Sequence, residues 1–132
     1  MRVVIDSNVL IAAFATHGLC SEVFELCLAE HDIFICSEIV GEVERVLIRK
    51  IKVPDKIAKE TIEYLNQHVH KLKPTKVSIK TCRDKRDLMV LGTAEKAKVD
   101  VIITGDKDLL IIKRYKNIKI VNPAEFWELL KS

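Results

Sequence analysis

The hydrophobic positions of the chain fall into two kinds of pattern. Runs of three or four apolar, often β-branched residues, such as residues 3–5 and 101–103, contain no polar alternation and are typical of strands covered on both faces. Between them lie longer segments in which apolar residues recur every three or four positions, the spacing of an amphipathic helix. Because strands alternate with helices, we expect right-handed βαβ units and a parallel sheet with helices on both sides.

The sequence therefore predicts the α/β class, with a three-layer α/β/α fold around a mainly parallel, twisted sheet of four to five strands. The predicted strands are residues 2–6, 33–36, 76–79, 101–103 and 118–121. The first predicted helix runs through residues 10–14, with Ser7 or Asn8 as its possible cap. The other predicted helices are residues 21–30, 37 to about 51–53, 55–71, 87–98 and 109–112, and a last helix that starts at residues 122–123. Pro54 is suited to the first turn of the fourth helix, and Pro74 breaks the chain after that helix.

Length and composition bound the class of protein. A chain of 132 residues suits one domain, and we expect a single domain over residues 1–132. Apolar residues make up 48% and charged residues 31%, which is a globular rather than a disordered composition. No apolar run approaches the ~20 residues of a bilayer span, and no signal-type apolar region precedes the first strand. We therefore expect a cytoplasmic protein that contacts no membrane.

The cysteines and the charges add two further constraints. The four cysteines lack CxxC spacing and histidine companions, so buried free thiols are favoured over a zinc site. Residues 45–86 hold 13 lysines and arginines against 4 acids, a net of +9, which leaves −6 for the rest of a chain whose total is +3. This distribution fits a surface for a polyanion beside a site that collects cations. Charge alone favours the simpler explanation, a solvated lysine-rich helix face.

Two buried-type strands end directly in an aspartate. Residues 3–5 run into Asp6, and residues 101–103 stop at Thr104 and Gly105, which are followed by Asp106 and Asp108. Gly105 permits a tight reversal at this point. Open α/β sheets bind ligands at the carboxyl ends of their strands, so neighbouring strands here would bring the two aspartates together. Each aspartate alone would be explained as a helix cap, but carboxylates brought close require a proton or a metal ion.

Helical spacing suggests further acids without choosing among them. Asp87 heads an apolar stripe and therefore needs a partner, but an acid in the first turn of a helix is also favoured by the helix dipole. Asp84 lies in the loop before it and competes for the same role. Glu42 flanks the apolar stripe of the third helix, yet Glu44 flanks the other side and Glu38 lies one turn earlier. Periodicity cannot distinguish these three.

Other chemistries find little support in the sequence. The four histidines form no HExxH or triad-like pattern, and no serine has a GxSxG context. No GxGxxG or P-loop is present, so a nucleotide cofactor is not indicated. Carboxylates without a nucleophile beside them suit hard, oxygen-preferring cations, and we expect Mg²⁺ or Mn²⁺.

Together these acids resemble the four acidic motifs of the PIN-domain ribonucleases. The order and spacing of the motifs agree over nearly the whole chain, and the last motif is the most specific. The resemblance is closest to the short single-domain prokaryotic PIN proteins that are toxin components of toxin–antitoxin pairs, relatives of the virulence-associated protein C type. The matching segments are residues 6–10, residues 37–43 before Leu47, residues 87–94 and residues 104–109.

The resemblance assigns roles to particular residues. It implies that Glu42, not Glu38 or Glu44, belongs to the second motif. The chain departs from the family at residues 83–87, where members often carry a proline and extra acids and this chain has Arg-Asp-Lys-Arg-Asp. This departure weakens the support for Asp87 over Asp84 as the acid of the third motif, and the cations nearby oppose metal binding. The implied catalytic and metal-binding acids are Asp6, Glu42, Asp87 and Asp106, with Asp108 as a supplementary ligand and Asn8 and Thr104 as supporting residues.

The implied activity is metal-dependent endoribonuclease cleavage of RNA by a two-metal-type mechanism. In the family, divalent ions activate a water molecule and stabilise the leaving oxygen, and the products carry a 5′-phosphate and a 3′-hydroxyl. The resemblance also implies a homodimer and a cognate antitoxin protein as partners. From the basic segment we expect contacts to the RNA backbone, which give affinity without sequence choice. The candidate residues for these contacts are Arg45, Arg49, Lys50 and Lys52.

Two alternatives remain at this point. A haloacid-dehalogenase-like phosphohydrolase also places an aspartate after its first strand, but its chemistry needs a second aspartate two residues later, and this chain has Asn8 there. A non-catalytic PIN-like module would bind RNA or protein with too little metal affinity to cut. Phosphatase activity on small esters would favour the first alternative, and failure to bind divalent cations would favour the second.

Overall fold

A single mostly parallel sheet forms the centre of the molecule. The computed structural model describes residues 1–78, 80–82 and 84–131. Within those residues the sheet has six strands in the order β3-β2-β1-β4-β6-β5, all parallel except for the antiparallel β5–β6 pair. The strands are β1 (Arg2–Ile5), β2 (Asp32–Ile35), β3 (His70–Lys71), β4 (Val101–Ile103), β5 (Arg114–Tyr115) and β6 (Ile118–Val121).

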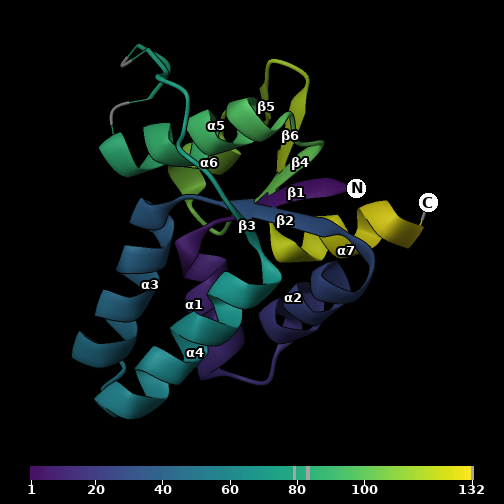
Figure 1. The fold of residues 1–132 in the computed structure, drawn as a ribbon. Coiled ribbons are helices and arrows are strands. Elements are labelled where there is room, and N and C mark those ends of the chain that lie inside the picture. Colours follow the sequence, from purple (N-terminus) through teal and green to yellow (C-terminus); the bar gives the residue numbers. More distant parts are fainter. Residues whose placement is uncertain (79, 83, 132) are drawn as a thin grey trace.

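Helices cover both faces of this sheet, which confirms the predicted three-layer α/β/α fold. α5 packs on β1, β2 and β4 from one side, while α2 and α7 pack on β2 and β6 from the other (Figure 1). α1 leaves the end of β1 and packs against α2 and α3, and α4 packs against α3. The helices are α1 (Ser7–Ala15), α2 (Leu19–Glu30), α3 (Ser37–Arg49), α4 (Asp55–His68), α5 (Lys85–Ala97), α6 (Lys107–Leu110) and α7 (Pro123–Lys131).

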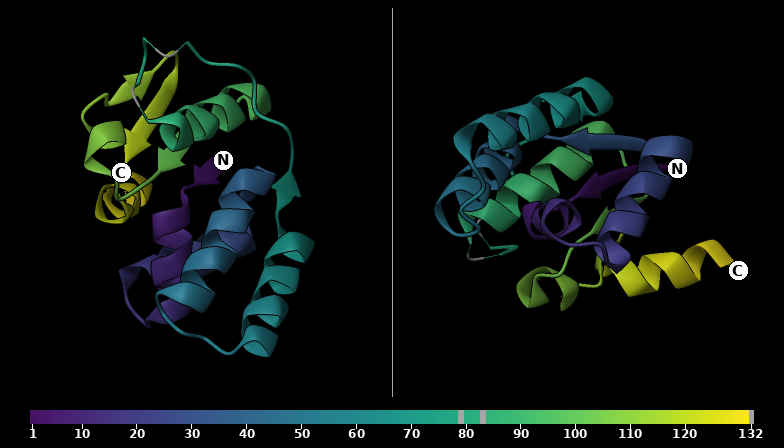
Figure 2. Two further views of the ribbon diagram at one scale, coloured as in Figure 1. Left: turned by 90° about the vertical axis from the view of Figure 1, so that its left-hand side faces the viewer. Right: turned by 90° about the horizontal axis from the view of Figure 1, so that it is seen from below.

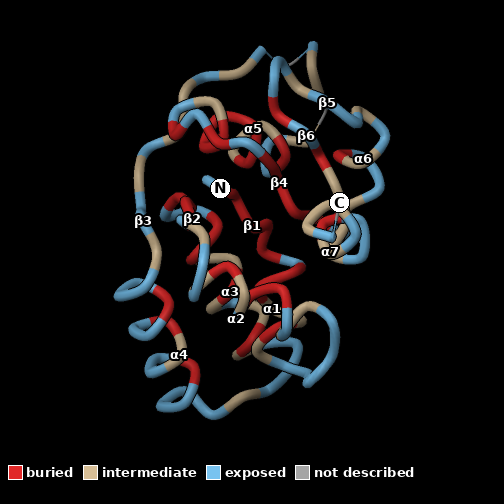
Figure 3. Tube along the Cα trace, turned by 90° about the vertical axis from the view of Figure 1, so that its right-hand side faces the viewer, coloured by how far each residue is buried: buried red, intermediate tan, exposed pale blue. Residues whose placement is uncertain are grey.

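The two central strands are the most deeply buried part of the chain. Every residue of β4 is buried, as is β1 from Val3 to Ile5, and both strands are red along most of their length in Figure 3. Their apolar runs without polar alternation follow from this, because a strand with a helix layer on each face has no solvated side. β1 and β4 are adjacent and parallel, with Ile5 opposite Ile103, so their carboxyl ends are level.

The third strand is where the sequence prediction was wrong. Residues 76–78 form no strand, and residue 79 lies outside the described residues. The predicted helix 55–71 instead ends at His68, and His70–Lys71 form β3 at the edge of the sheet beside β2. Edge strands are often short and polar, so they carry little of the apolar signal on which the prediction relied. The two-residue strand β5 was not predicted either, so the described residues form a sheet of six strands where four to five were expected. Among smaller differences, α2 begins at Leu19 rather than at Ser21.

Residues 72–78, which follow β3, run from the edge of the sheet toward α5 (Figures 1 and 2). Leu72 N still donates to the carbonyl of Ile35 in β2 at 3.0 Å, whereas Thr75 N donates to the carbonyl of Gly92 in α5 at 3.1 Å. A Cβ at Gly92 would lie 2.2 Å from the carbonyl oxygen of Thr75. The close approach of the two backbones therefore requires glycine at this position.

No helix among the described residues is individually long and apolar enough to cross a membrane. α1 and α2 satisfy the criteria of length and apolarity only when taken together, as a pair bent by 106°.

We expect Gly92→Ala to lower the free energy of unfolding by about 1–3 kcal/mol, because the added methyl group must displace the Thr75 backbone. The matched control is Gly41→Ala in α3, where a Cβ meets no atom within 4 Å. There the usual helix preference for alanine should raise the free energy of unfolding by about 0.5–1 kcal/mol. Urea denaturation followed by circular dichroism measures both changes, and a stabilising Gly92→Ala would contradict the close packing of this segment on α5.

Candidate metal centre

The site is built on the level carboxyl ends of β1 and β4. Asp6 N donates to the carbonyl of Ile103 at 2.9 Å, which extends the pairing of the two strands by one residue. The Thr104 hydroxyl then donates to Asp6 Oδ2 at 2.8 Å. Strand pairing thus places the first acidic motif directly beside the last one, although 98 residues separate Asp6 from Thr104.

Asp6 is almost completely buried and is held by hydrogen bonds from its neighbours. Its Oδ1 accepts from the backbone N–H of Ser7 at 2.8 Å, and its Oδ2 accepts from the Asn8 amide at 3.2 Å in addition to Thr104. Burial raises the pKa of Asp6, and the negative charges of Glu42 and Asp106 raise it further, while the hydrogen bonds from Thr104 and Ser7 lower it. A buried carboxylate among other carboxylates is stabilised by a bound cation.

The side chains of Asn8 and Thr104 connect the ends of β1 and β4, because each donates a hydrogen bond to Asp6 and also accepts one from the backbone after β4. Asn8 Oδ1 accepts from Gly105 N at 2.9 Å, and Thr104 Oγ1 accepts from Asp106 N at 3.0 Å. Gly105 does not adopt a positive φ, so the chain does not use the left-handed conformation that favours glycine there. A Cβ at Gly105 would lie 3.4 Å from Asn8 Oδ1, so the small residue instead leaves room for the Asn8 side chain.

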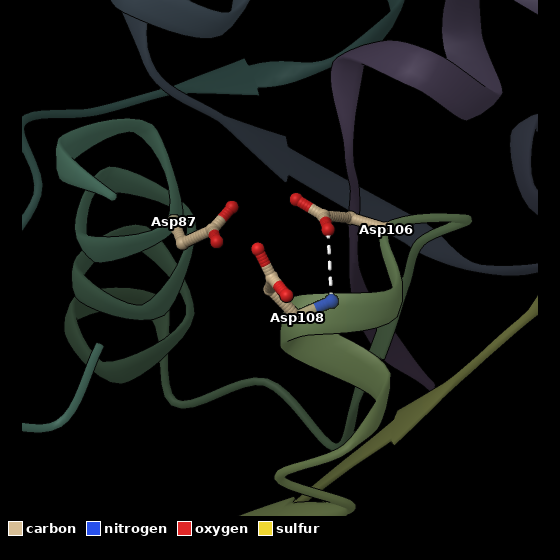
Figure 4. Close-up of side chains that lie close together, drawn as sticks. All are labelled: Asp87, Asp106 and Asp108. Atoms are coloured by element: carbon tan, nitrogen blue, oxygen red, sulfur yellow. Dashed lines mark hydrogen bonds between the residues drawn. The ribbon is translucent and has the colours of Figure 1, made fainter. Parts of the chain in front are cut away.

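Three further carboxylates converge next to Asp6. Asp87 projects from the first turn of α5, Asp106 precedes α6 and Asp108 lies in α6, and the three point toward one another (Figure 4). One oxygen from each lies within 4.8 Å of the others. Opposite ligands of an octahedral Mg²⁺ with metal–oxygen distances near 2.1 Å are about 4.2 Å apart, so the spacing of this group is close to that of a shared hard cation.

The pKa of Asp87 is strongly raised. Its side chain is 2% exposed, and burial together with the neighbouring carboxyl of Asp106 raises the pKa of Asp87 to about 7. The Cys82 thiol donates to Asp87 Oδ2 at 3.4 Å, which opposes the rise. Near neutral pH the metal-free cluster is therefore partly neutralised by a proton on Asp87.

The structure separates Asp87 from Asp84, the alternative that the sequence left open. Asp84 is the N-cap of α5 and accepts from Arg86 N at 2.8 Å, which lowers the pKa of Asp84. It does not belong to the group formed by Asp87, Asp106 and Asp108. Two acids of the site are helix caps as well, since the side chain of Asp6 caps α1 and the side chain of Asp106 caps α6.

Glu42 reaches the same cleft from α3 and is held from two sides. The Ser7 hydroxyl donates to Glu42 Oε1, and the guanidinium of Arg86 donates to Glu42 Oε2. Arg86 also approaches Asp84 Oδ2 at 3.4 Å. The cleft has a volume of ≈ 430 Å³, and we call it the acidic cleft. Its lining includes the acids Asp6, Glu42, Asp87 and Asp106, with Ser7, Asn8, Lys50 and Arg86 around them.

The candidate RNA-binding residues are placed unequally. Lys50, just after α3, lines the acidic cleft, and Arg45 lines a second cavity beside it. Arg49 and Lys52 are exposed but line neither cavity. Lys52 adopts a φ of 63° in the turn that follows α3.

Sequence reasoning missed two residues that organise the site. Ser7 was interpreted as a possible helix cap, whereas Asp6 is the cap and the Ser7 hydroxyl binds Glu42. Arg86 was noted only as a cation near the third motif, whereas it is the ion-pair partner of Glu42. The sequence signal that could have identified Arg86 was its position one residue before Asp87, in the first helical turn beside a buried acid. The partner on α3 was not visible from sequence spacing.

The fold and the four converging acids define an α/β protein with an acidic cleft suited to divalent cations at the carboxyl ends of its sheet. A family model described as PIN domain matches residues 2–108. This stretch contains all the acids described above, and the chain therefore belongs to the PIN domain family.

Solved structures with the same fold include two toxin–antitoxin complexes. VapBC-1 from nontypeable Haemophilus influenzae aligns with a TM-score of 0.68 at 16% identity, covering 94% of this chain and 99% of that chain. VapBC2 from Rickettsia felis, bound to a DNA fragment from its promoter, aligns with a TM-score of 0.63 at 14% identity, covering 92% and 98%. At these identities the likeness shows the fold. No curated protein matches the chain significantly.

We expect Asp87→Asn to stabilise the metal-free protein at about pH 8 but not at about pH 4. The pKa of Asp87 is about 7 in the folded chain against an ordinary value of 3.8, so the folded state binds the proton more tightly. Stability contributed by that proton is complete below pH ~4 and is lost as the pH rises to ~7. The amide does not titrate and avoids this loss.

Thermal unfolding in a chelator at several pH values measures the effect. For a domain of this size 1 kcal/mol shifts Tm by roughly 3–6 °C, so the gain at the higher pH should be several degrees. Glu63→Gln, which removes a carboxylate at an exposed position in α4, is the control. A pH-independent effect of Asp87→Asn would contradict a raised pKa at this carboxyl.

Proposed function

We propose that the chain is a Mg²⁺- or Mn²⁺-dependent endoribonuclease that hydrolyses RNA phosphodiester bonds. The observation that carries this proposal is the convergence of Asp6, Glu42, Asp87 and Asp106, from four separate elements, on one cleft. Carboxylates gathered in this way are costly without a cation, and the oxygen-only donor set favours hard divalent ions. Membership of the PIN domain family supports a nuclease.

The residues present fit a divalent centre. Asp87, Asp106 and Asp108 form the group whose oxygens are close enough to share one ion, and Asp6 and Glu42 are the acids next to it. A divalent cation bound here supplies a lowered pKa for water and neutralises charge that develops on the leaving oxygen.

The other residues of the cleft position the acids and the substrate. Thr104 and Asn8 fix the orientation of the Asp6 carboxylate, and Ser7 fixes one oxygen of Glu42. Arg86 neutralises the other oxygen of Glu42, and we infer that its guanidinium turns to a substrate phosphate when a cation takes over that carboxylate. Lys50 adds a positive charge at the edge of the cleft.

We further propose that this nuclease is the toxin of a toxin–antitoxin pair, with a cognate antitoxin protein as partner and a homodimer as its assembly. The fold that it shares with the VapBC complexes supports the toxin role and the antitoxin partner. We propose the cytoplasm as its compartment, and the free thiols of Cys20, Cys27 and Cys36 agree with a reducing environment.

The haloacid-dehalogenase alternative loses its support at position 8. That chemistry needs a general acid two residues after the first aspartate, and here Asn8 uses both ends of its amide to connect Asp6 with Gly105. A non-catalytic PIN module remains the other outcome of the experiment below.

We expect cleavage of single-stranded RNA to require Mn²⁺ or Mg²⁺ and to stop on addition of a chelator. Loss of an outer-shell partner of a metal site costs about 10–100-fold, so removing a ligand by Asp106→Asn or Asp6→Asn should lower the rate by more than about 100-fold. Gel analysis of a labelled RNA measures the rate, and the products should carry 5′-phosphate and 3′-hydroxyl ends. Asp32→Asn, in β2 and outside the cleft, is the matched control and should cut at the wild-type rate.

Calorimetric titration with Mn²⁺ separates the two remaining functions. A folded protein that binds no divalent cation and leaves RNA intact would be a binding module. Metal binding with phosphatase activity on small esters and no RNA cleavage would restore the phosphohydrolase.

We expect the paired variant Arg45→Gln, Lys50→Gln to reduce the salt dependence of RNA binding. Each phosphate contact on a single strand contributes about 0.7 to the slope of log affinity against log salt, so losing two contacts should reduce the slope by about 1.4. Fluorescence anisotropy of a labelled RNA at several salt concentrations measures it. Lys59→Gln, at an exposed position in α4, is the control. An unchanged slope in the paired variant would make the basic segment a solvated face only.

A further inference from the structure

A second cavity adjoins the acidic cleft, between α3 and α5. Its volume is ≈ 310 Å³, at the lower end of the range for small-ligand sites. Asp6, Glu42 and Arg86 line both spaces, so the cavity opens beside the carboxylates of the candidate metal centre. We call it the adjoining cavity.

The lining of the adjoining cavity divides into an apolar part and a charged part. Ile39 from α3 and Met89 and Val90 from α5 supply the apolar surface. Arg45 and Lys85 are exposed cations in the same lining, in addition to Arg86. Glu38 is a further acid there, with two oxygens that can accept hydrogen bonds. An apolar surface with cations beside it matches a group that is flat and apolar but attached to phosphate.

Gly41 gives an independent indication that this space accommodates a ligand. It lies in the interior of α3, where glycine is less stable than alanine, and it also lines the cavity. Gly92 has a reason within the protein, because a Cβ there would meet the Thr75 backbone. A Cβ at Gly41 meets nothing within 4 Å, and its backbone needs no positive φ. The absent side chain therefore leaves the helix surface open to something outside the chain.

We propose that the adjoining cavity binds one unpaired nucleotide of the RNA substrate, next to the phosphodiester that is cut. The base lies on the apolar surface against the backbone at Gly41, and its phosphate faces Arg45, Lys85 and Arg86. A base can enter only after leaving its stack, so the site selects single-stranded RNA over a duplex. This inference rests on the proposed function and names the substrate feature that the same site recognises.

The test fills the cavity without disturbing the fold. Gly41→Leu places a side chain in the open space, and Gly41→Ala is the conservative variant. Gly18→Leu is the matched control, because it makes the same change at an exposed glycine where a Cβ also has room, beyond the far end of α1. The probes are a fluorescein-labelled oligoadenylate decamer and a ribose-phosphate decamer without bases, both with a chelator present to prevent cleavage.

We expect Gly41→Leu to bind the oligoadenylate about tenfold more weakly than the wild type, within the range that one stacked base contributes. Its affinity for the base-free decamer should be unchanged, and Gly18→Leu should bind both probes as the wild type does. Binding of Mn²⁺ to Gly41→Leu should also be unchanged, which separates loss of the nucleotide from loss of the metal centre. Met89→Ala removes part of the apolar surface and should weaken only the oligoadenylate, which keeps the test valid if Gly41→Leu folds poorly.

The nucleotide site would be overturned if Gly41→Leu bound the oligoadenylate as tightly as the wild type does. Met89→Ala takes its place in this comparison where Gly41→Leu does not fold. Metal-dependent cleavage by the wild type would still leave the proposed function standing. Equal weakening of both probes would show that the cavity does not recognise the base, and would overturn the proposal as well. A wild-type protein that neither binds nor cuts RNA would remove the proposed function and this inference together.

Discussion

The structure depends on keeping several carboxylates together at the end of two buried strands. Pairing of β1 with β4 in one register brings Asp6 beside Thr104, and the turn after β4 adds Asp106 and Asp108. Val3–Ile5 are buried on both faces and are flanked by the charged residues Arg2 and Asp6, so a slip of one residue would draw a charged side chain further into the core; burial of the apolar run therefore sets the register. The hydrophobic core thus supplies the force that holds mutually repelling charges in place.

Three different means offset that repulsion in the metal-free chain. Asp6 receives hydrogen bonds from a backbone N–H, an amide and a hydroxyl. Glu42 has the guanidinium of Arg86, and Asp87 retains a proton to about pH 7. Only the first of these remains useful once a cation is bound, since the guanidinium and the proton both compete with it. A bound cation can therefore replace the guanidinium of Arg86 and the proton on Asp87, which are two of the three groups that offset the repulsion in the metal-free site.

What the sequence predicted and what it missed follow from the range of the interactions involved. Asp6 and Asp106 were recognised because a buried strand that ends in an aspartate is a local pattern. Glu42 could not be chosen over its helical neighbours by periodicity, because the choice depends on the orientation of α3 toward β1. The edge strand β3 was missed because its two exposed residues bury nothing, and its place is set by pairing with β2. The Arg86–Glu42 pair joins residues 44 apart and leaves no trace in spacing.

The uneven charge of the chain becomes intelligible once α3 and α5 are seen to face each other across the cleft. The basic stretch 45–86 begins with Arg45 on α3 and ends with Arg86 on α5, and these two ends line one cavity. The excess of acids lies in the rest of the chain, which supplies most of the carboxylates in the cleft. A polyanion approaching an acidic cluster is repelled unless cations surround it, and positive potential at the entrance raises the rate of encounter. α3 and α5 thus carry two acids of the cleft, Glu42 and Asp87, together with the cations Arg45 and Arg86. The proposed function requires both charges, since the acids would hold a divalent cation and the cations would attract the RNA.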